Sequence, residues 1–386
     1  MEKCGKEGRC VRLCTSDRLL GSMVARAEIF CADFCRMDME TSVIIGPEAL
    51  PALAELLRRP AVSRVFVLVD GNTARLCLPL LLPHLPADYK LIEIPAGEEY
   101  KTLASCDTVW CELTGLHADR HAVLVNVGGG VVTDLGGFAA ALYKRGIRFV
   151  QVPTTLLAQV DASVGGKTGV DFQGFKNQLG VFQAPAGVFV EPKFLETLDP
   201  RQLKSGYAEV VKHWLIADAD AFDTNRRLGW LTDDWTSIIR ESVALKQRIV
   251  ASDPLEAGPR KLLNFGHTVG HALESYLLSQ PGREALHGEA VAAGIVCESW
   301  LSVQRGLLSA EELDKIETFV FSVFDKLDFV TLETNAIAEF ALQDKKNAGA
   351  TINCTLLSGI GHGVYDQPVT VAEIAESLRY YHRLQA

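Results

Sequence analysis

The chain has 386 residues, of which 48% are hydrophobic, and 38 Lys and Arg against 48 Asp and Glu give a formal net charge of −10. These values are ordinary for a globular protein and exclude a collagen, a coiled coil or a disordered chain over most of the length. The acidic balance argues against a nucleic-acid partner, although a small site can still be locally basic and bind an anion.

Residues 1–40 differ from the rest of the chain. Five of the ten cysteines fall within the first 35 residues, without the C-x-x-C pair that would indicate a zinc module. Basic and acidic residues are mixed there without a clear period, and signals of a fold begin near residue 42. We predict that residues 1–40 form an atypical, cysteine-rich extension without ordered structure. The alternative is a regulatory or targeting segment.

The chain shows no sign of a membrane protein. No apolar run reaches the ~18 residues that a bilayer span requires. The N-terminus lacks the continuous apolar stretch of a signal peptide. We therefore expect a cytoplasmic protein with no membrane partner.

Short apolar segments alternate with helical patterns between residues 42 and 198, which predicts βαβ units and a mostly parallel sheet. The expected strands are residues 42–45, 64–70, 90–94, 122–127, 148–152 and 187–190. Helical periods dominate further on, notably at residues 202–216, 236–251 and 289–304. We therefore predict an α/β fold, with a Rossmann-like NAD-binding domain over residues 41–198 and an all-helical domain over residues 199–386. The ligand site is expected between them.

A glycine-rich segment, Asn-Val-Gly-Gly-Gly-Val-Val-Thr-Asp, occupies residues 126–134, between an expected strand and a helical pattern. Glycines let the backbone approach a phosphate, and the start of a helix offers free N–H groups, so a phosphate or dinucleotide site is indicated. The spacing is not the G-x-G-x-x-G fingerprint, and a tight turn without a ligand is the alternative. Asp70 closes an earlier strand, where either a ribose contact or a plain turn is expected.

Residues 161–168, Asp-Ala-Ser-Val-Gly-Gly-Lys-Thr, resemble a P-loop only superficially. The first glycine of G-x-x-x-x-G-K-[ST] is replaced by Asp161, so an ATPase is not predicted. Glycines near Lys167, Lys176 and Asn177 still indicate an anion-binding surface, with a solvated lysine loop as the alternative. Arg145 offers a bidentate fork for phosphate or carboxylate.

A metal site is indicated by histidines with regular spacing. His267 and His271 lie four residues apart in a helical pattern and share a helix face. With His287 and Glu209 they suit a catalytic zinc ion that keeps one position open, ordinary core histidines being the alternative. The spacing does not decide which of His267 and His271 binds the metal. The other is a candidate general acid or base.

These motifs occur in one order along the chain. They are residues 128–134, Val-Pro-Thr-Thr at 152–155, residues 161–167, residues 174–177, residues 205–212, Lys246, residues 260–271, His-Gly-Glu at 287–289 and Asp-Lys-Lys at 344–346. On this series, from about residue 42 to 365, the chain resembles the 3-dehydroquinate synthases, a family of sugar phosphate cyclases. The first 40 residues lie outside the resemblance, and the stretch from His271 to His287 is a few residues longer than the family pattern.

The resemblance implies a phosphorus–oxygen lyase of the shikimate route to aromatic amino acids. Its substrate would be 3-deoxy-D-arabino-heptulosonate 7-phosphate, and its products 3-dehydroquinate and phosphate. It implies NAD, a divalent metal (Zn2+, with Co2+ possible) and a homodimer. In the implied mechanism, NAD oxidises C5, the ketone makes the C6 proton acidic so that phosphate leaves, NADH returns the hydride, and an intramolecular aldol step closes the carbocycle.

The resemblance also implies roles residue by residue. The metal ligands would be Glu209, His267 and His287. NAD would be surrounded by Asp70, Asn72, Glu98, Lys101, Gly129, Gly130, Val131, Asp134, Thr154, Thr155, Lys176, Phe194, Leu195 and Thr197. The substrate would contact Arg145, Asp161, Lys167, Lys176, Asn177, Lys212, Lys246, Arg260, Asn264, His271, and Lys345 or Lys346. The catalytic set would be Lys167, Lys212, Lys246, Arg260, Asn264 and His271.

Three alternatives stay open. Sister cyclases that act on other sugar phosphates come first, but Lys246, Arg260, Asn264 and His271 match the dehydroquinate type. A metal-dependent polyol dehydrogenase of related architecture would not need so many Lys and Arg residues. A non-catalytic relative has no support, because the expected metal and substrate residues are present.

Overall fold

The computed structural model describes residues 41–173, 175–280, 282–283, 285–343 and 352–384. The prediction for residues 1–40 therefore lies outside the described residues, as do the predictions for Lys345 and Lys346. Within the described ranges, no helix combines the length and the hydropathy needed to cross a membrane.

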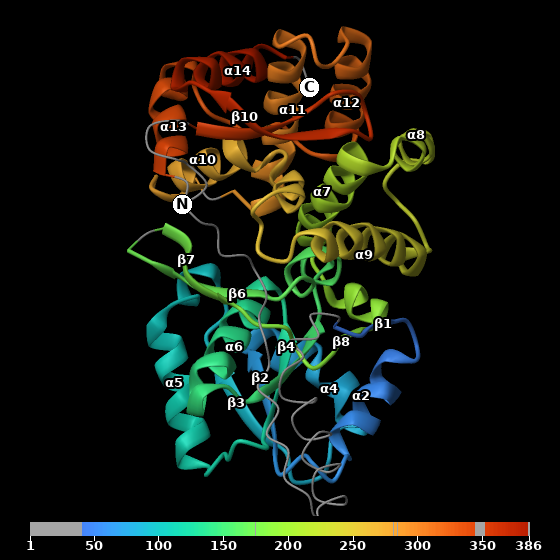
Figure 1. The fold of residues 1–386 in the computed structure, drawn as a ribbon, viewed down its shortest axis with the longest axis vertical. Helices are drawn as coiled ribbons and strands as arrows, with labels where there is room; N and C mark the ends of the chain where they lie inside the picture. The colour runs from blue at the N-terminus through green and yellow to red at the C-terminus, as the bar shows by residue number, and fades with distance from the viewer. Residues whose placement is uncertain (1–40, 174, 281, 284, 344–351, 385–386) are drawn as a thin grey trace, which may run out of the picture. The chain divides into compact units, whose positions relative to one another are not determined.

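Six parallel strands form a central sheet in the order β1-β8-β5-β4-β2-β3 (Figure 1). They are β1 (Val43–Ile45), β2 (Val65–Asp70), β3 (Lys90–Ile94), β4 (Val123–Gly128), β5 (Arg148–Pro153) and β8 (Val188–Val190). Each agrees with an expected strand to within one residue at either end, which confirms the predicted parallel sheet. The inner strands are continuous apolar runs because both faces of the sheet are covered.

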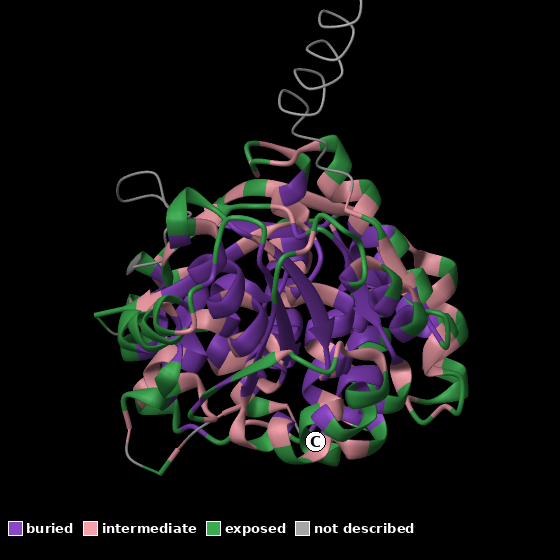
Figure 2. Ribbon diagram, turned by 90° about the horizontal axis from the view of Figure 1, so that it is seen from below, coloured by how far each residue is buried: buried purple, intermediate pink, exposed green. Residues whose placement is uncertain are grey.

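Helices cover the two faces of the sheet. They are α2 (Ala49–Leu57), α3 (Gly71–Leu76), α4 (Leu78–Leu81), α5 (Leu103–Gly115) and α6 (Gly130–Leu142). Successive residues of β2 point to opposite faces, so Phe66 and Leu68 share a core with α5 and α6, whereas Val67 and Val69 share one with α2 and α4. Figure 2 shows the buried strands enclosed by partly exposed helices.

Residues 167–182 form an antiparallel hairpin of β6 (Lys167–Phe172) and β7 (Phe175–Phe182). These two strands were not among the predicted ones, and the alternative of a solvated lysine loop is wrong, whereas the anion-binding surface stays a prediction. Gly169 pairs with Gly180, and a Cβ on either would lie 2.6 or 2.7 Å from a carbonyl oxygen of the opposite strand. The two glycines permit this close approach. Because glycine is uncommon in strands, the same residues hide the two strands in the sequence.

The C-terminal region is mainly helical, as predicted. Its helices are α7 (Pro200–Ala217), α8 (Ala219–Leu228), α9 (Trp235–Ser252), α10 (His267–Leu278), α11 (His287–Gln304), α12 (Ala310–Val323), α13 (Thr334–Phe340) and α14 (Val371–Arg383). It is not purely helical, because β9 (Ile352–Leu357) and β10 (Gly363–Val369) form a hairpin. Apolar and polar residues alternate over the first five residues of β9, a period of two that is too short to stand out from the helical periods around it. The domain boundary near residue 199 stays a prediction.

Short helical turns connect these elements. They are η1 (Leu82–His84), η2 (Glu98–Tyr100), η3 (Tyr143–Arg145), η4 (Ala158–Ala162), η5 (Pro192–Thr197), η6 (Pro259–Asn264), η7 (Thr331–Glu333) and η8 (Ala341–Gln343).

Candidate active site

The glycine segment lies where the direction of the sheet connections reverses. β2 and β4 are neighbours, but the chain continues from β2 to β3 on one side and from β4 to β5 on the other. In open α/β sheets, ligands bind in the crevice that such a reversal creates at the carboxyl ends of the strands. Asp70 ends β2 at this edge, and Gly129 joins β4 to α6.

The first N–H groups of α6 are available to a ligand because its N-cap residue, Gly129, makes no side-chain cap. A Cβ on Gly128 would lie 2.5 Å from the Cβ of Val132, and a Cβ on Gly129 would lie 2.9 Å from Cγ2 of Thr155. The turn therefore requires both glycines. Thr154 N–H donates to the carbonyl of Gly128 at 3.0 Å, so Thr154 borders the segment, and its contact with NAD stays a prediction. Gly130 and Val131 are the first two residues of α6.

Other residues predicted at the nucleotide have structural partners of their own. The Asp70 carboxylate accepts a hydrogen bond from Asn72 N–H at 2.9 Å and caps helix α3, so the chain starts a helix here and does not form a plain turn. A ribose contact stays a prediction. Phe194 and Leu195 are buried in η5. The Thr197 hydroxyl donates to the carbonyl of Phe194 at 2.7 Å. Only the backbone of the two buried residues is therefore suited to contact a ligand.

Two lysines join the β6–β7 hairpin to the carboxyl edge of the sheet. Lys101 is 4% exposed, and its Nζ donates to Asp134 Oδ2 and to Asn177 Oδ1, both at 2.6 Å. Lys176 Nζ lies 3.3 Å from Glu98 Oε1. Residues predicted around NAD thus come together from the η2 turn, α6 and β7.

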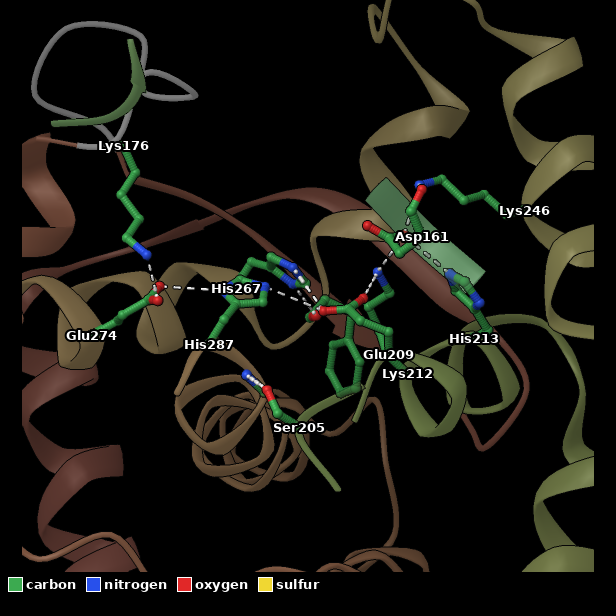
Figure 3. Close-up of polar contacts among 12 residues, drawn as sticks. Asp161, Lys176, Ser205, Glu209, Lys212, His213, Lys246, His267, Glu274 and His287 are labelled. Atoms are coloured by element: carbon green, nitrogen blue, oxygen red, sulfur yellow. Dashed lines mark hydrogen bonds and ion pairs between the residues drawn. The ribbon is translucent and has the colours of Figure 1, made fainter. Parts of the chain in front are cut away.

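Three histidines and one glutamate converge from three helices, and Figure 3 shows Glu209 with two of the histidines, His267 and His287. His267 opens α10, His271 follows one turn later, and His287 opens α11. One ring nitrogen of each lies within 4.8 Å of those of the other two. Glu209 of α7 places its Oε1 3.4 Å from Nε2 of both His267 and His287. The His271 ring lies beside them, with its centroid 5.1 Å from that of His267.

This donor set fits a divalent metal. Glu209 is fully buried, and among the described residues its Oε1 has no conventional hydrogen-bond partner. Ligands held at about 2.0–2.1 Å from a tetrahedral zinc ion are about 3.3 Å apart. The 3.4 Å separations from Glu209 to the nitrogens of His267 and His287 match that spacing. If the histidines were ordinary core residues with no metal between them, Glu209 Oε1 would be buried without a hydrogen-bond partner or a metal ion.

Hydrogen bonds behind the two imidazoles fix their orientation. His267 Nδ1 lies 3.0 Å from the carbonyl of Phe265, which assigns the proton to Nδ1 and leaves the Nε2 lone pair toward the cluster. His287 Nδ1 lies 3.2 Å from Glu274 Oε2, and the other oxygen of Glu274 accepts from Lys176 at 2.6 Å. Metal-binding histidines commonly use such a carbonyl or carboxylate partner.

Glu274 is a site residue that sequence reasoning missed. It lies seven residues after His267 and three after His271, so one helix face presents all three, and this spacing was a usable signal. Burial raises the pKa of Glu274, but His287 and Lys176 outweigh burial and lower the pKa below its usual value. The carboxylate therefore stays ionised.

Asp161, in η4, forms ion pairs with two further lysines. Its Oδ1 accepts from Lys246 Nζ at 2.7 Å and lies 3.6 Å from Lys212 Nζ, and Lys212 also donates to Glu209. Burial raises the pKa of Asp161, but Lys212 and Lys246 outweigh it and hold the pKa well below the ordinary range. A continuous network therefore runs through Lys176, Glu274, His287, Glu209, Lys212, Asp161 and Lys246 (Figure 3).

His213 was also missed. It is fully buried, with Nδ1 2.6 Å from the Ser242 hydroxyl and Nε2 3.6 Å from Asp161 Oδ1. Burial lowers the pKa of His213 to about 4, so the imidazole is neutral at neutral pH. The sequence carried no signal for this residue, because its neighbours come from η4 and α9.

A second group of predicted substrate residues surrounds Glu256. Lys167 donates to one oxygen of Glu256, and Asn264 Nδ2 donates to the other at 3.1 Å. Arg260 is 2% exposed, and its guanidinium donates to the carbonyl of Gly165 at 2.8 Å. Glu256 was not predicted, since an acidic residue in an exposed-looking loop carries no sign of such partners.

Arg145 lies away from these groups. It belongs to η3, after the end of α6 and before the start of β5. α6 has 13 residues and is therefore about 20 Å long. Within one chain, the structure thus places Arg145 at the opposite edge of the sheet from the glycine segment, and it does not join the other predicted substrate residues.

Family models match most of the described chain. The N-terminal model of 3-dehydroquinate synthase matches residues 91–205, and the C-terminal model matches residues 206–347. The chain belongs to the 3-dehydroquinate synthase family. A 3-dehydroquinate synthase of Parabacteroides distasonis is 41% identical over 347 residues, which cover 89% of this chain and 98% of the relative. One from Campylobacter concisus is 37% identical over 328 residues, with 85% and 94% covered.

Solved structures of other cyclases share the fold. The 2-epi-5-epi-valiolone synthase of Streptomyces hygroscopicus subsp. jinggangensis 5008, solved with NAD+ and Zn2+, has a TM-score of 0.77 at 29% identity, covering 90% of this chain and 98% of its own. A 2-deoxy-scyllo-inosose synthase, solved with carbaglucose-6-phosphate, NAD+ and Co2+, has a TM-score of 0.78 at 24% identity, covering 88% and 96%. At that identity the likeness shows the fold.

Proposed function

We propose that this chain catalyses the reaction of its family, the conversion of 3-deoxy-D-arabino-heptulosonate 7-phosphate into 3-dehydroquinate and phosphate, with NAD and a divalent metal, Zn2+ or Co2+. One observation carries the proposal. The glycine segment adjoins the ion network, since a Cβ on Gly130 would lie 3.7 Å from that of Ala162. Ala162 follows Asp161, whose partner Lys212 leads directly to Glu209. The candidate nucleotide site and the candidate metal site are thus adjacent, which a hydride transfer between a bound substrate and NAD would require.

NAD supplies a reversible hydride acceptor, and a divalent metal acidifies a hydroxyl that it binds. Glu209, His267 and His287 would hold the metal, and the N-terminus of α6 behind Gly129 would hold the nucleotide pyrophosphate. The 2-epi-5-epi-valiolone synthase, at 29% identity, was solved with NAD+ and Zn2+, which supports a nucleotide and a metal in this chain. His271, beside this cluster, would contact the substrate and act as a general acid or base.

The substrate carries a carboxylate and a phosphate, and the candidate site is rich in cations although the protein is acidic. Lys246 and Arg260 would hold the carboxylate end and the ring hydroxyls, while Lys167 and Asn177 would hold the phosphate end. Lys167 now bonds Glu256, so substrate oxygens would replace an internal carboxylate there. Holding one reactant by both ends supplies the orientation that each step needs.

The leaving phosphate is suited to act as its own base, which requires no further side chain. The homodimer, the cytoplasmic location and the place in aromatic amino acid biosynthesis belong to the same proposal. They rest on membership of the family.

Phosphate release from the heptulosonate phosphate, with and without EDTA, tests the reaction. We expect EDTA-sensitive release, 3-dehydroquinate as the carbocyclic product and no net accumulation of NADH. Release from another sugar phosphate alone would favour a sister cyclase, and NADH accumulation with a polyol would favour a dehydrogenase.

The variant His267→Ala tests the metal assignment. Loss of one of three protein ligands should abolish both bound zinc and phosphate release. A folded, zinc-free His267→Ala protein with full activity would contradict the proposal.

A further inference from the structure

Helix α10 begins with two N–H groups that its own first turn cannot satisfy. In a capping box, the N-cap side chain accepts from the N–H of N3, and the N3 side chain accepts from the N–H of the N-cap. Here the N-cap is Gly266, which has no side chain, and N3 is Val269, which is apolar. A buried N–H without a partner destabilises the fold, so acceptors must come from elsewhere.

One carboxylate of a neighbouring helix satisfies both groups. Glu298 of α11 accepts from Gly266 N–H through Oε2 at 2.6 Å and from Val269 N–H through Oε1 at 3.0 Å. Glu298 is fully buried. A buried carboxylate is tolerated where backbone N–H groups bond it, and the positive end of a helix dipole favours it further. Glu298 therefore performs both halves of a capping box from another helix.

The backbones of α10 and α11 are in direct contact around this carboxylate. Gly266 has a φ of +76°, a left-handed conformation that favours glycine, and a Cβ there would lie 2.8 Å from Cγ1 of Ile295. A Cβ on Gly294 would lie 2.8 Å from the backbone nitrogen of Gly270. The helices have little room to slide, and the two Glu298 hydrogen bonds tie the first turn of α10 to α11 at this register.

We propose that Glu298 is a positioning residue for the metal site. It fixes the first turn of α10, and thereby the direction of His267 Nε2, relative to α11, which begins with His287. This inference rests on the ligand set of the proposed function. Glu298 acts through the backbone and touches neither the metal nor the substrate. Partners behind metal ligands typically change affinity by about 10- to 100-fold, and we expect an effect near the lower value for Glu298.

Zinc binding by Glu298 variants tests this role. In Glu298→Gln, one of the two N–H groups would face an amide NH2, and in Glu298→Asp the carboxylate is one methylene shorter. Ser299→Ala is the matched control, because Ser299 is the next residue of α11, is buried and, among the described side chains, has a hydroxyl without a hydrogen-bond partner. Zinc affinity is measured by competition with a chromophoric chelator, and ligand geometry by the visible absorption of the Co2+ form.

We expect zinc affinity about 10-fold lower and a changed Co2+ spectrum in Glu298→Gln, a smaller change in Glu298→Asp, and no change in Ser299→Ala. If the Glu298 variants lose stability but keep wild-type affinity and spectrum, Glu298 has a purely structural role and the inference is overturned. If only one Glu298 variant folds, that variant decides. If the folded wild-type protein binds no zinc, the ligand set falls together with the inference.

Discussion

Replacing Gly288 by alanine perturbs the contact that sets the distance between α7 and α11. A Cβ on Gly288 would lie 2.5 Å from the carbonyl carbon and 2.6 Å from the Cα of Ser205. These are backbone atoms that no rotamer change can move, and non-bonded carbons need about 3.5 Å, so the helices must separate by about 1 Å. His287 precedes Gly288, and Glu209 lies one turn after Ser205. The displacement therefore acts on the 3.4 Å separation between the side chains of Glu209 and His287.

Metal–ligand distances tolerate deviations of about 0.2 Å, so a displacement of about 1 Å should lower zinc affinity by about 10-fold or more. Overpacking should also lower the free energy of unfolding of the metal-free protein by about 1–3 kcal/mol. Chelator competition measures the first effect, and urea unfolding the second. Gly115→Ala is the control, since a Cβ on this α5 residue would meet nothing within 4 Å. Wild-type zinc affinity in Gly288→Ala would refute the reasoning.

Two further predictions concern buried ionisable side chains. Burial lowers the pKa of His213 from 6.5 to about 4. Between these values the unfolded chain binds a proton that the folded chain does not, so stability falls with falling pH by up to about 3 kcal/mol. His213→Gln should remove this contribution to the pH dependence of the unfolding free energy, measured by urea unfolding between pH 7 and pH 4.5. An unchanged pH dependence would contradict the prediction. Lys101→Met leaves the Asp134 carboxylate without its cation and should lower the free energy of unfolding by about 3–5 kcal/mol. Adding Asp134→Leu to the same chain should restore most of this loss. Losses that simply add in the double variant would contradict this.

The central sheet was predictable because each strand is a short apolar run bounded by polar or turn residues. Burial on both faces of the sheet requires that composition, so the pattern in the sequence follows directly from the fold. The β6–β7 hairpin was not predictable in the same way. Its pairing depends on Gly169 meeting Gly180 across the strands, and glycine in one strand gives no sign of glycine in its partner.

The candidate metal cluster was predictable in part. The spacing of His267 and His271 gave the shared helix face, and His287 and Glu209 completed a donor set typical of zinc. The family resemblance was needed to choose His267 over His271 as the ligand. Glu274 lay within reach of the same helical-spacing argument. The contacts of Glu256, His213 and Glu298 were not, because each depends on elements that are brought together only by tertiary packing.

The capping of α10 from α11 has a consequence for local motion. The first turn of a helix usually frays most easily, because its N–H groups have no partners within the helix. Here the N–H groups of Gly266 and Val269 are bonded to Glu298, so the start of α10 cannot open without breaking a contact with α11. α10 and α11 should therefore open together as one cooperative unit, and His267 and His287 keep their relative positions through small fluctuations of the chain.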